Sequence, residues 1–140
     1  MNRTAADKLA VAAQEAARNA YAPYSKFKVG AAVMTDKGIF SGCNVENSSY
    51  GLTTCAERVA VFKAVSEGAK VVKAVAVFAT SPQSKIPNPK SKIGLPFPCG
   101  ACLQVINEFG ENPDIILSNG ERTEFYRLKD LLPNGFRLKK

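Results

Sequence analysis

Three of the four cysteines lie at the starts of two segments with helical spacing, and this placement constrains the fold more than any other feature of the chain. Cys55 precedes the first segment, whereas Cys99 and Cys102 open the second, and a strand-like segment separates them. A CxxC pair at a helix start can hold one tetrahedral Zn²⁺ ion, because the positive end of the helix dipole favours deprotonated thiols. We therefore expect a fold in which two helix starts converge on one ion.

The set of possible metal ligands narrows because the chain has no histidine. A third strong ligand must then be another cysteine or a carboxylate, and Cys55 is the best candidate. Three protein ligands leave one tetrahedral position for water, which is typical of a catalytic site. Two alternatives stay open. Cys43 could complete a closed four-thiolate structural site, or Cys99 and Cys102 could form a thioredoxin-like redox pair.

Two residues that follow Cys55 add chemistry to this site. The carboxylate of Glu57 could move protons between an activated water and a substrate. Thr54 and Glu57 also match a capping box, which is a purely structural motif. Three thiolates give a zinc centre a net negative charge, and Arg58 is placed to donate hydrogen bonds to them. As an alternative, Arg58 is an ordinary surface arginine.

Length and composition bound the class of protein. With 140 residues, of which 46% are apolar and 22% charged, the chain is expected to form one domain over residues 1–140. Lys73 and the prolines after Thr80 interrupt the longest apolar stretch, so we expect no membrane span. The charged N-terminal segment does not resemble a signal peptide, which favours a cytoplasmic protein. The formal charge of +7 is spread along the chain, which predicts a basic surface rather than nucleic-acid binding.

Hydrophobic periodicity predicts an alternation of helices and strands. The expected helices are 4–20, 55–67, 100–109 and 128–132, and the expected strands are 27–33, 39–46, 71–80, 114–118 and 123–127. The proline-rich segment Ser81–Pro98 is predicted to be an extended surface loop. On the second strand Asn44 and Glu46 share one face, and Cys43 lies on the other.

Several short motifs together resemble the small, homotetrameric type of cytidine deaminase over nearly the whole chain, from Tyr24 to Phe136. The motifs occur in the order found in that family, and their combination is far more specific than any one of them. They are FxVGAA (27–32), GCNVEN (42–47), TCAER (54–58), PCGACxQ (98–104), and LLP (131–133) followed by Phe136.

The resemblance implies an α/β fold, a three-layer α/β/α sandwich around a mixed five-stranded sheet. It also implies one Zn²⁺ per subunit, held by Cys55, Cys99 and Cys102, and hydrolytic deamination of cytidine or 2'-deoxycytidine. Glu57 would be the proton shuttle, and Arg58 would compensate the charge of the thiolates.

By the same resemblance, Asn44 and Glu46 would hold the ribose hydroxyls, while Phe27 and Ala56 would contact the substrate. The family is homotetrameric and builds each pocket from several subunits. Similarity would let Ser48, Tyr50 and Phe136 reach into neighbouring sites.

Two departures from the family pattern bear on this expectation. Leu103 stands where the family usually has arginine, which could alter activity or assembly. The loop at Ser81–Pro98 is longer than is typical of the family, so substrate preference is less constrained than reaction type. Alternatives are therefore a deaminase of a related aminopyrimidine, such as blasticidin S or a modified cytidine, and a zinc-stabilised RNA-binding module.

Overall fold

A five-stranded mixed sheet forms the middle of the computed structural model, which describes residues 1–80 and 94–140. The spatial order of the strands is β2-β1-β3-β4-β5. Only β3 and β4 pair in parallel, and the other neighbours are antiparallel. The strands are β1 (Val29–Thr35), β2 (Gly38–Cys43), β3 (Val72–Ala79), β4 (Asp114–Ser118) and β5 (Thr123–Arg127).

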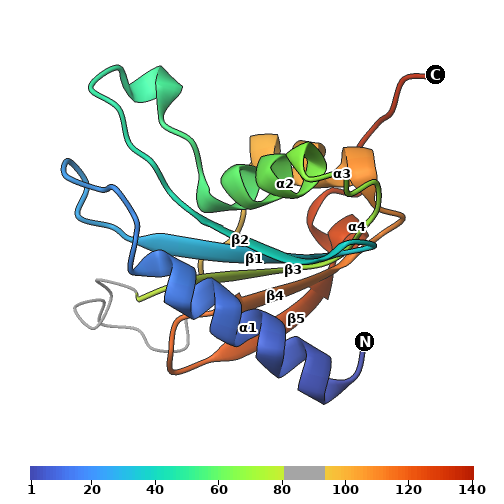
Figure 1. The fold of residues 1–140 in the computed structure, drawn as a ribbon, viewed down its shortest axis with the longest axis horizontal. Coiled ribbons are helices and arrows are strands. Elements are labelled where there is room, and N and C mark those ends of the chain that lie inside the picture. Colours follow the sequence, from blue (N-terminus) through green and yellow to red (C-terminus); the bar gives the residue numbers. More distant parts are fainter. Residues whose placement is uncertain (81–93) are drawn as a thin grey trace.

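Helices cover both faces of this sheet (Figure 1). The helix α1 (Arg3–Ala17) lies on one face, and α2 (Ala56–Ser66), α3 (Gly100–Phe109) and the short α4 (Leu128–Leu131) lie on the other. The predicted three-layer α/β/α sandwich with a mixed five-stranded sheet is therefore confirmed. The predicted loop at Ser81–Pro98 falls mostly on residues 81–93, which lie outside the described residues.

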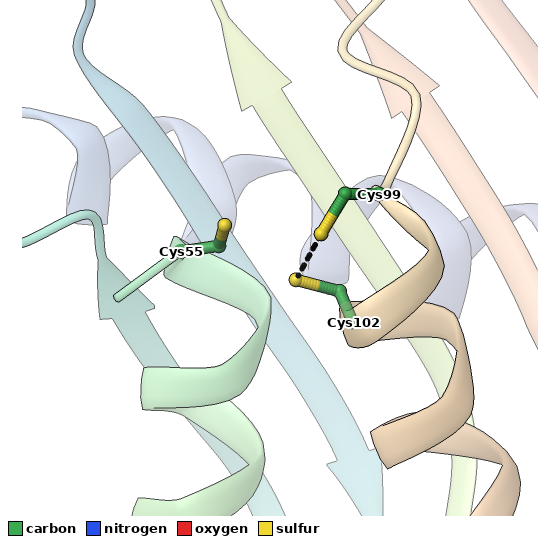
Figure 2. Close-up of side chains that lie close together, drawn as sticks. All are labelled: Cys55, Cys99 and Cys102. Atoms are coloured by element: carbon green, nitrogen blue, oxygen red, sulfur yellow. Dashed lines mark hydrogen bonds between the residues drawn. The ribbon is translucent and has the colours of Figure 1, made fainter. Parts of the chain in front are cut away.

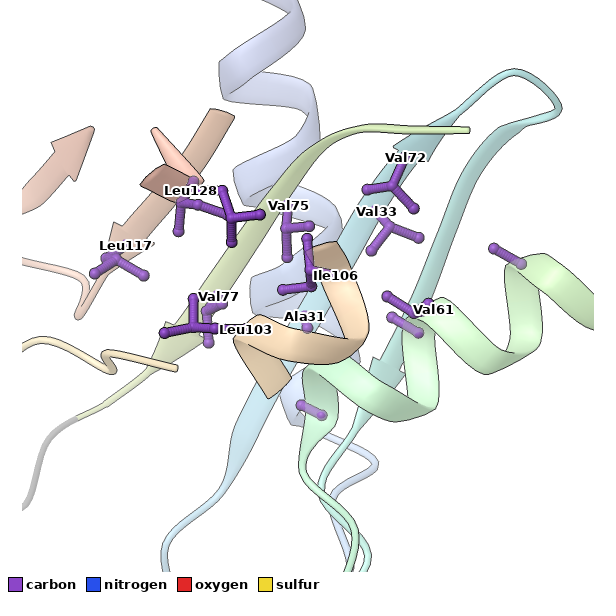
Figure 3. Close-up of a cluster of buried hydrophobic side chains, with 14 of the residues drawn as sticks. Ala31, Val33, Val61, Val72, Val75, Val77, Leu103, Ile106, Leu117 and Leu128 are labelled. Carbon is purple, nitrogen blue, oxygen red and sulfur yellow. The ribbon is translucent and has the colours of Figure 1, made fainter. Parts of the chain in front are cut away.

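The period of two in the central strands divides their side chains between two cores. Alternate residues of β1, β3 and β4 face α2 and α3, and the residues between them face α1, so these strands are buried on both sides. The core under α2 and α3 (Figure 3) includes Ala31, Val33, Val75, Val77, Leu103, Ile106 and Leu117, and the core under α1 includes Leu9, Ala13, Ala32, Ala76 and Ile116.

Two glycines let helices approach the sheet more closely than any other residue would allow. A Cβ atom placed on Gly30 would lie 1.9 Å from the carbonyl oxygen of Ala13 in α1. A Cβ atom on Gly42 would lie 2.6 Å from the backbone nitrogen of Ala60 in α2. Because backbone atoms cannot move aside as a flexible side chain can, both positions require glycine for steric reasons.

The first hairpin differs from its prediction at both ends. The strand β1 begins at Val29 rather than Phe27, and β2 ends at Cys43 rather than Glu46. Beyond β2, Val45 makes only isolated bridges, to Tyr21 and to Thr54. The chain therefore leaves the sheet before the predicted ribose-binding residues, which stand on connecting segments. A 3-10 turn at Tyr50–Leu52 was not predicted.

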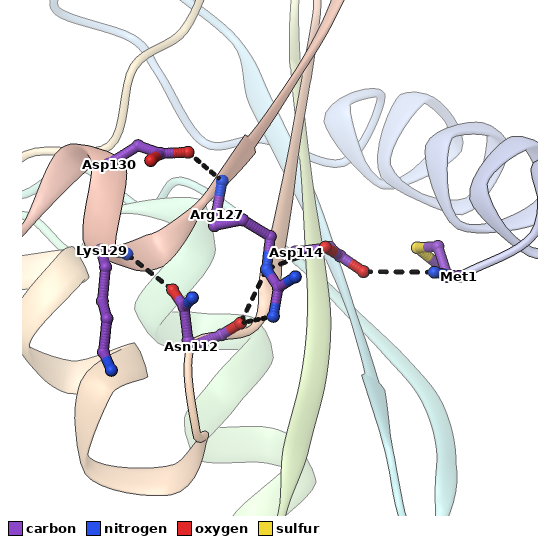
Figure 4. Close-up of polar contacts among 6 residues, drawn as sticks. All are labelled: Met1, Asn112, Asp114, Arg127, Lys129 and Asp130. Atoms are coloured by element: carbon purple, nitrogen blue, oxygen red, sulfur yellow. Dashed lines mark hydrogen bonds and ion pairs between the residues drawn. The ribbon is translucent and has the colours of Figure 1, made fainter.

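A polar network joins the start of β4 to the end of β5 (Figure 4). The carboxylate of Asp114 lies 3.5 Å from the Met1 ammonium and 3.3 Å from Nε of Arg127. The Arg127 guanidinium also donates to the carbonyl of Asn112, whose side-chain oxygen accepts from the backbone of Lys129. Because α3 ends at Phe109, just before β4 begins at Asp114, this network lies near the end of α3 rather than at its start.

The close approach at Gly30 predicts that Gly30→Ala destabilises the fold. The added methyl group must push α1 off the sheet, so we expect the free energy of unfolding to fall by about 1–3 kcal/mol in a urea titration. Gly51→Ala is the matched control, because a Cβ atom there meets nothing within 4 Å. A Gly30→Ala protein as stable as the control would contradict the steric explanation.

Candidate metal centre and active site

The sulfur atoms of Cys55, Cys99 and Cys102 meet between the starts of α2 and α3. All three Sγ atoms lie within 4.8 Å of one another, and those of Cys99 and Cys102 are 3.4 Å apart. Figure 2 shows that Cys55 comes from one helix start and the other two cysteines from the second. All three thiols are free rather than oxidised to disulfides. The predicted convergence of two helix starts is confirmed.

Both helices begin with a cysteine in the capping position. Cys55 is the N-cap of α2 and Cys99 is the N-cap of α3, and neither side chain makes a capping hydrogen bond within the described part of the chain. Their sulfurs are therefore available as ligands. The unpaired backbone N–H groups of the first turn and the helix dipole favour a negative charge at this place.

The three sulfurs fit a tetrahedral zinc ion. With Zn–S bonds of about 2.3 Å, tetrahedral geometry places sulfurs about 3.8 Å apart, which lies between the 3.4 Å that separates Cys99 from Cys102 and the 4.8 Å within which all three sulfurs lie. Three protein ligands leave the fourth position open, as in catalytic rather than structural zinc sites. A hydrogen bond from the Cys102 thiol lowers the pKa of Cys55, so one thiolate is already favoured in this cluster.

The fourth cysteine does not join this group. Cys43 lies at the end of β2, paired across the sheet with Gly30, and among the described residues the cluster contains only the other three. The geometry therefore does not support the closed four-thiolate site. The third sulfur, from Cys55, also distinguishes the site from an isolated CxxC redox pair.

Arg58 supplies the positive charge that the sulfurs require. Its Nη2 atom donates to Sγ of Cys55 at 3.4 Å, so it is not simply a surface arginine. Its Nε atom is buried and has no hydrogen-bond partner among the described residues. The guanidinium thus keeps spare donor capacity beside an anionic cluster, which is a place where charge-assisted hydrogen bonds are strong.

Glu57 is one of the few buried charged side chains in the described residues, with 5% of its surface exposed. Burial raises its pKa to about 7, and the neighbouring thiolate of Cys55 acts in the same direction. A carboxyl group with a pKa near neutrality can both accept and release a proton under ordinary conditions. The environment of Glu57 therefore suits general acid and base chemistry.

The capping-box interpretation of Glu57 is wrong. The N-cap of α2 is Cys55, not Thr54, and no side chain caps it in the described structure. The hydroxyl of Thr54 donates instead to the carbonyl of Leu52 at 3.3 Å. Helix capping therefore does not account for a glutamate at position 57. Its burial beside the sulfurs points to a role in the site instead.

The side chain of Asn44 is buried and bonded to the segment that precedes β1. Its Oδ1 accepts from the backbone N–H of Val29 at 2.9 Å, and its Nδ2 donates to the carbonyl of Phe27 at 2.8 Å. Asn44 therefore fixes Phe27 relative to the end of β2. One N–H of the amide is left over for a ligand in this arrangement.

Glu46 is held by the segment just before Phe27. Its Oε1 accepts from the backbone N–H groups of Tyr24 and Ser25, at 3.0 and 3.1 Å, and its Oε2 accepts from the Ser25 hydroxyl. The hydrogen bond from that hydroxyl lowers the pKa of Glu46. A pocket of about 390 Å³ adjoins these groups, lined by Tyr24, Ser25, Glu46, Tyr50 and Thr53.

The remaining predicted site residues have different surroundings. Ala56 is buried between Cys55 and Glu57. Ser48 shares a hydrogen bond of 2.7 Å with the Tyr24 hydroxyl, and Tyr50 packs edge-on against the Tyr24 ring. The aromatic rings of Tyr50 and Phe136 are mostly exposed, at 76% and 65% of their residue surface.

Leu103 takes its place in the core. It is 5% exposed and belongs to the same cluster as Val77 and Leu117 (Figure 3). At the next turn Ile106 faces the same way, so a leucine at position 103 continues the apolar face of α3.

Sequence reasoning missed the role of Tyr24 and Ser25 in holding Glu46. The contact joins residues 21 and 22 positions apart, so periodicity gives no sign of it. The one local sign of order in this segment is Ser25 itself, because a serine often forms a turn by accepting from the N–H two residues later. Here the Ser25 hydroxyl accepts from the N–H of Phe27.

A three-thiolate centre with an open position and a buried carboxyl group, on an α/β/α sandwich, defines the class of zinc-dependent hydrolytic enzymes.

None of the helices in the described ranges has the length and apolar character needed to cross a bilayer.

Comparison with known proteins identifies the family. The model for the cytidine and deoxycytidylate deaminase zinc-binding region matches residues 3–118. The chain is 44% identical over 133 residues to a cytidine deaminase of Sporosarcina psychrophila, covering 93% of this chain and 90% of that protein. The crystal structure of cytidine deaminase from Burkholderia pseudomallei superposes with a TM-score of 0.80 at 42% identity, covering 97% and 100% of the two chains. The chain belongs to the cytidine and deoxycytidylate deaminase family.

A more distant relative is a deaminase of another substrate. The blasticidin-S deaminase of Bacillus cereus is 26% identical over 110 residues, which cover 78% of this chain and 76% of that protein. Its similarity is thus well below that of the cytidine deaminases.

The geometry predicts which thiols are needed for the metal. Cys55→Ser, Cys99→Ser and Cys102→Ser should each lose most of the bound zinc, because two sulfurs do not hold the ion as three do. Cys43→Ser should keep one zinc per chain, as measured by atomic absorption on the purified proteins. Loss of zinc from the Cys43 variant would show that the fourth thiol also binds the ion.

Proposed function

We propose that the protein is a cytidine deaminase that hydrolyses cytidine, 2'-deoxycytidine or both to the corresponding uracil nucleoside and ammonia. The observation that carries this proposal is the position of Glu57, buried beside the converging thiols and interacting with Cys55 and Cys102. The reaction would serve pyrimidine salvage in the cytoplasm.

The metal would be held by Cys55, Cys99 and Cys102. When bound, Zn²⁺ supplies Lewis-acid activation of a water molecule at neutral pH. Arg58 offsets part of the negative charge of the ligands, because it already donates to one of the sulfurs.

Glu57 would carry protons through the reaction. Its carboxylate accepts a proton as water adds to carbon 4 of the pyrimidine, and passes a proton to the adjacent ring nitrogen. It then takes the proton of the new hydroxyl group on carbon 4, which becomes the carbonyl oxygen, and delivers a proton to the amino group, so that the carbon–nitrogen bond breaks and ammonia leaves. A single carboxyl group next to the metal ligands is enough for these transfers.

The nucleoside would be held by groups on the segments that flank β1 and β2. Asn44 and Glu46 offer a donor and an acceptor for ribose hydroxyls, and Phe27 packs against the base. Ala56, at the start of α2, would contact the base between the metal ligands and Glu57. The hydrogen bonds that fix Asn44 and Glu46 support this, because prearranged polar groups bind without a large ordering cost.

The similarity to known deaminases favours cytidine over blasticidin S, at 44% against 26% identity. An RNA-binding module with a purely structural zinc is disfavoured by the buried carboxyl group of Glu57, which such a protein would not need. A modified cytidine is a further candidate substrate, and rate measurements with each nucleoside would distinguish it from cytidine.

We also propose a homotetramer with shared active sites. The exposed rings of Tyr50 and Phe136, together with the exposed side chain of Leu52, give the chain an apolar surface beyond its own core. The backbone carbonyl of Phe136 accepts from Gln104 at 2.8 Å, and Arg137 donates to the end of α3. The C-terminal segment is therefore anchored on α3 with its aromatic ring free. Phe136, Ser48 and Tyr50 would reach sites of neighbouring subunits.

The proposed reaction predicts a loss of cytidine absorbance at 37 °C with release of ammonia, and a strong dependence on Glu57. In Glu57→Gln the proton shuttle is gone while the metal ligands remain, so we expect kcat to fall by about 10²- to 10⁴-fold with zinc content unchanged. Parallel assays with deoxycytidine and blasticidin S rank the substrates. Faster turnover of blasticidin S than of cytidine would overturn the substrate assignment, and near-normal activity of Glu57→Gln would overturn the mechanism.

Shared sites predict complementation between two defective variants. Glu57→Gln lacks the proton shuttle, and Phe136→Ala lacks the ring that a neighbour would supply. If subunits exchange on mixing and refolding, some sites in the mixture combine an intact Glu57 with an intact Phe136. We expect activity above the sum of the two separate preparations. Strictly additive activity from a mixture shown to contain both chains in one tetramer would argue against a shared site.

A further inference from the structure

The carboxylate of Glu46 is enclosed by hydrogen bonds from a segment that lies 21 and 22 residues earlier in the chain. Two backbone N–H groups, of Tyr24 and Ser25, point at Oε1, and the hydroxyl of Ser25 points at Oε2. Of the described residues that bond to this carboxylate, Ser25 alone contacts both oxygens. Its side chain is exposed in the single chain, so it is not needed to fill a core.

The hydroxyl of Ser25 has a defined direction. Its oxygen accepts a hydrogen bond from the backbone N–H of Phe27 at 3.0 Å. A hydroxyl group has a single proton to donate, and here that proton is directed at Glu46. The Phe27 contact therefore orients the hydroxyl, and the hydroxyl orients the carboxylate.

The hydrogen bonds leave room for one ligand on Glu46. A carboxylate offers about four acceptor positions on its two oxygens. Among the described residues, Tyr24 and Ser25 use two positions on Oε1 and one on Oε2. The position left over is on Oε2, the oxygen that Ser25 fixes, and Glu46 lines the adjoining pocket.

We propose that Ser25 is a positioning residue that holds Oε2 of Glu46 in place to accept a hydrogen bond from a ribose hydroxyl of the substrate. This inference rests on the proposed deamination of a nucleoside. Among the described residues, the hydrogen bonds of Ser25 reach Glu46 and Phe27 and none of the three cysteines. Its effect should therefore depend on the sugar hydroxyls and not on the chemistry at carbon 4.

The experiment compares cytidine with 2',3'-dideoxycytidine, which carries the same reacting base but neither of the ring hydroxyls. For cytidine, Ser25→Ala should raise KM at least about tenfold, the lower end of the effect of a hydrogen bond to a charged group, with kcat changed less than threefold. For the dideoxy substrate, the same variant should change kcat/KM less than threefold. Where its turnover is too slow, its inhibition constant against cytidine gives the same comparison.

Two further variants separate positioning from folding. Ser25→Thr keeps the hydroxyl at an exposed position and should restore the KM for cytidine to within threefold of the wild type. Ser66→Ala is the matched control, because in the described part of the chain its hydroxyl bonds only to the helix carbonyl of Lys63. This variant should leave both substrates unaffected. In a Glu46→Gln background, Ser25→Ala should add less than threefold to the KM for cytidine.

The outcomes are distinct. An equal loss on cytidine and on the dideoxy substrate, or an undiminished effect of Ser25→Ala in the Glu46→Gln background, would overturn the positioning role while leaving deamination intact. A zinc-loaded wild-type protein that turns over no cytidine would overturn the proposed function itself, and the inference with it.

Discussion

The structure depends on apolar packing that forces three sulfur atoms together. The helices α2 and α3 lie on the same face of the sheet because Val61, Leu103 and Ile106 are buried against it, and Gly42 lets α2 sit close to β2. Their N-terminal ends then bring Cys55, Cys99 and Cys102 within 4.8 Å. Three thiolates at this distance would repel one another, so without a cation the cluster keeps protons, and the hydrogen bond that Cys102 donates to Cys55 raises the pKa of Cys102. Binding of a cation releases those protons and offsets the repulsion.

A feature of the fold could be predicted from the sequence where the residues that determine it lie in one segment. The bounds of α3 were predicted from the spacing of Cys102, Ile106 and Phe109, and the structure has the same bounds, because helix periodicity is contained in one segment. The ends of the first hairpin could not be predicted. The amide of Asn44, rather than a strand backbone, accepts from the N–H of Val29 and donates to the carbonyl of Phe27. Side-chain contacts over 15 and 17 positions leave no periodic pattern.

The site shows the same division. The three cysteines and Glu57 were predicted from residue type and spacing, since few other residues can hold zinc in a chain without histidine. The partners of these residues were harder to predict. Arg58 was expected beside the thiolates because it follows Glu57 directly, whereas Ser25 and Tyr24 reach Glu46 only through the tertiary fold. Metal ligands can thus be predicted from residue type and spacing, whereas the groups that orient the side chains of the site depend on contacts made only in the folded chain.

The surroundings of Glu46 and Glu57 suit these two glutamates to opposite tasks in the proposed reaction. Hydrogen bonds from Ser25 and Tyr24 lower the pKa of Glu46, so it stays an ionised acceptor, which suits binding a hydroxyl. Burial raises the pKa of Glu57 to about 7, so it can hold or release a proton, which suits chemistry. Neither role follows from the residue type, because both side chains are the same. The difference lies in backbone N–H groups offered to one carboxylate and in the removal of water from the other.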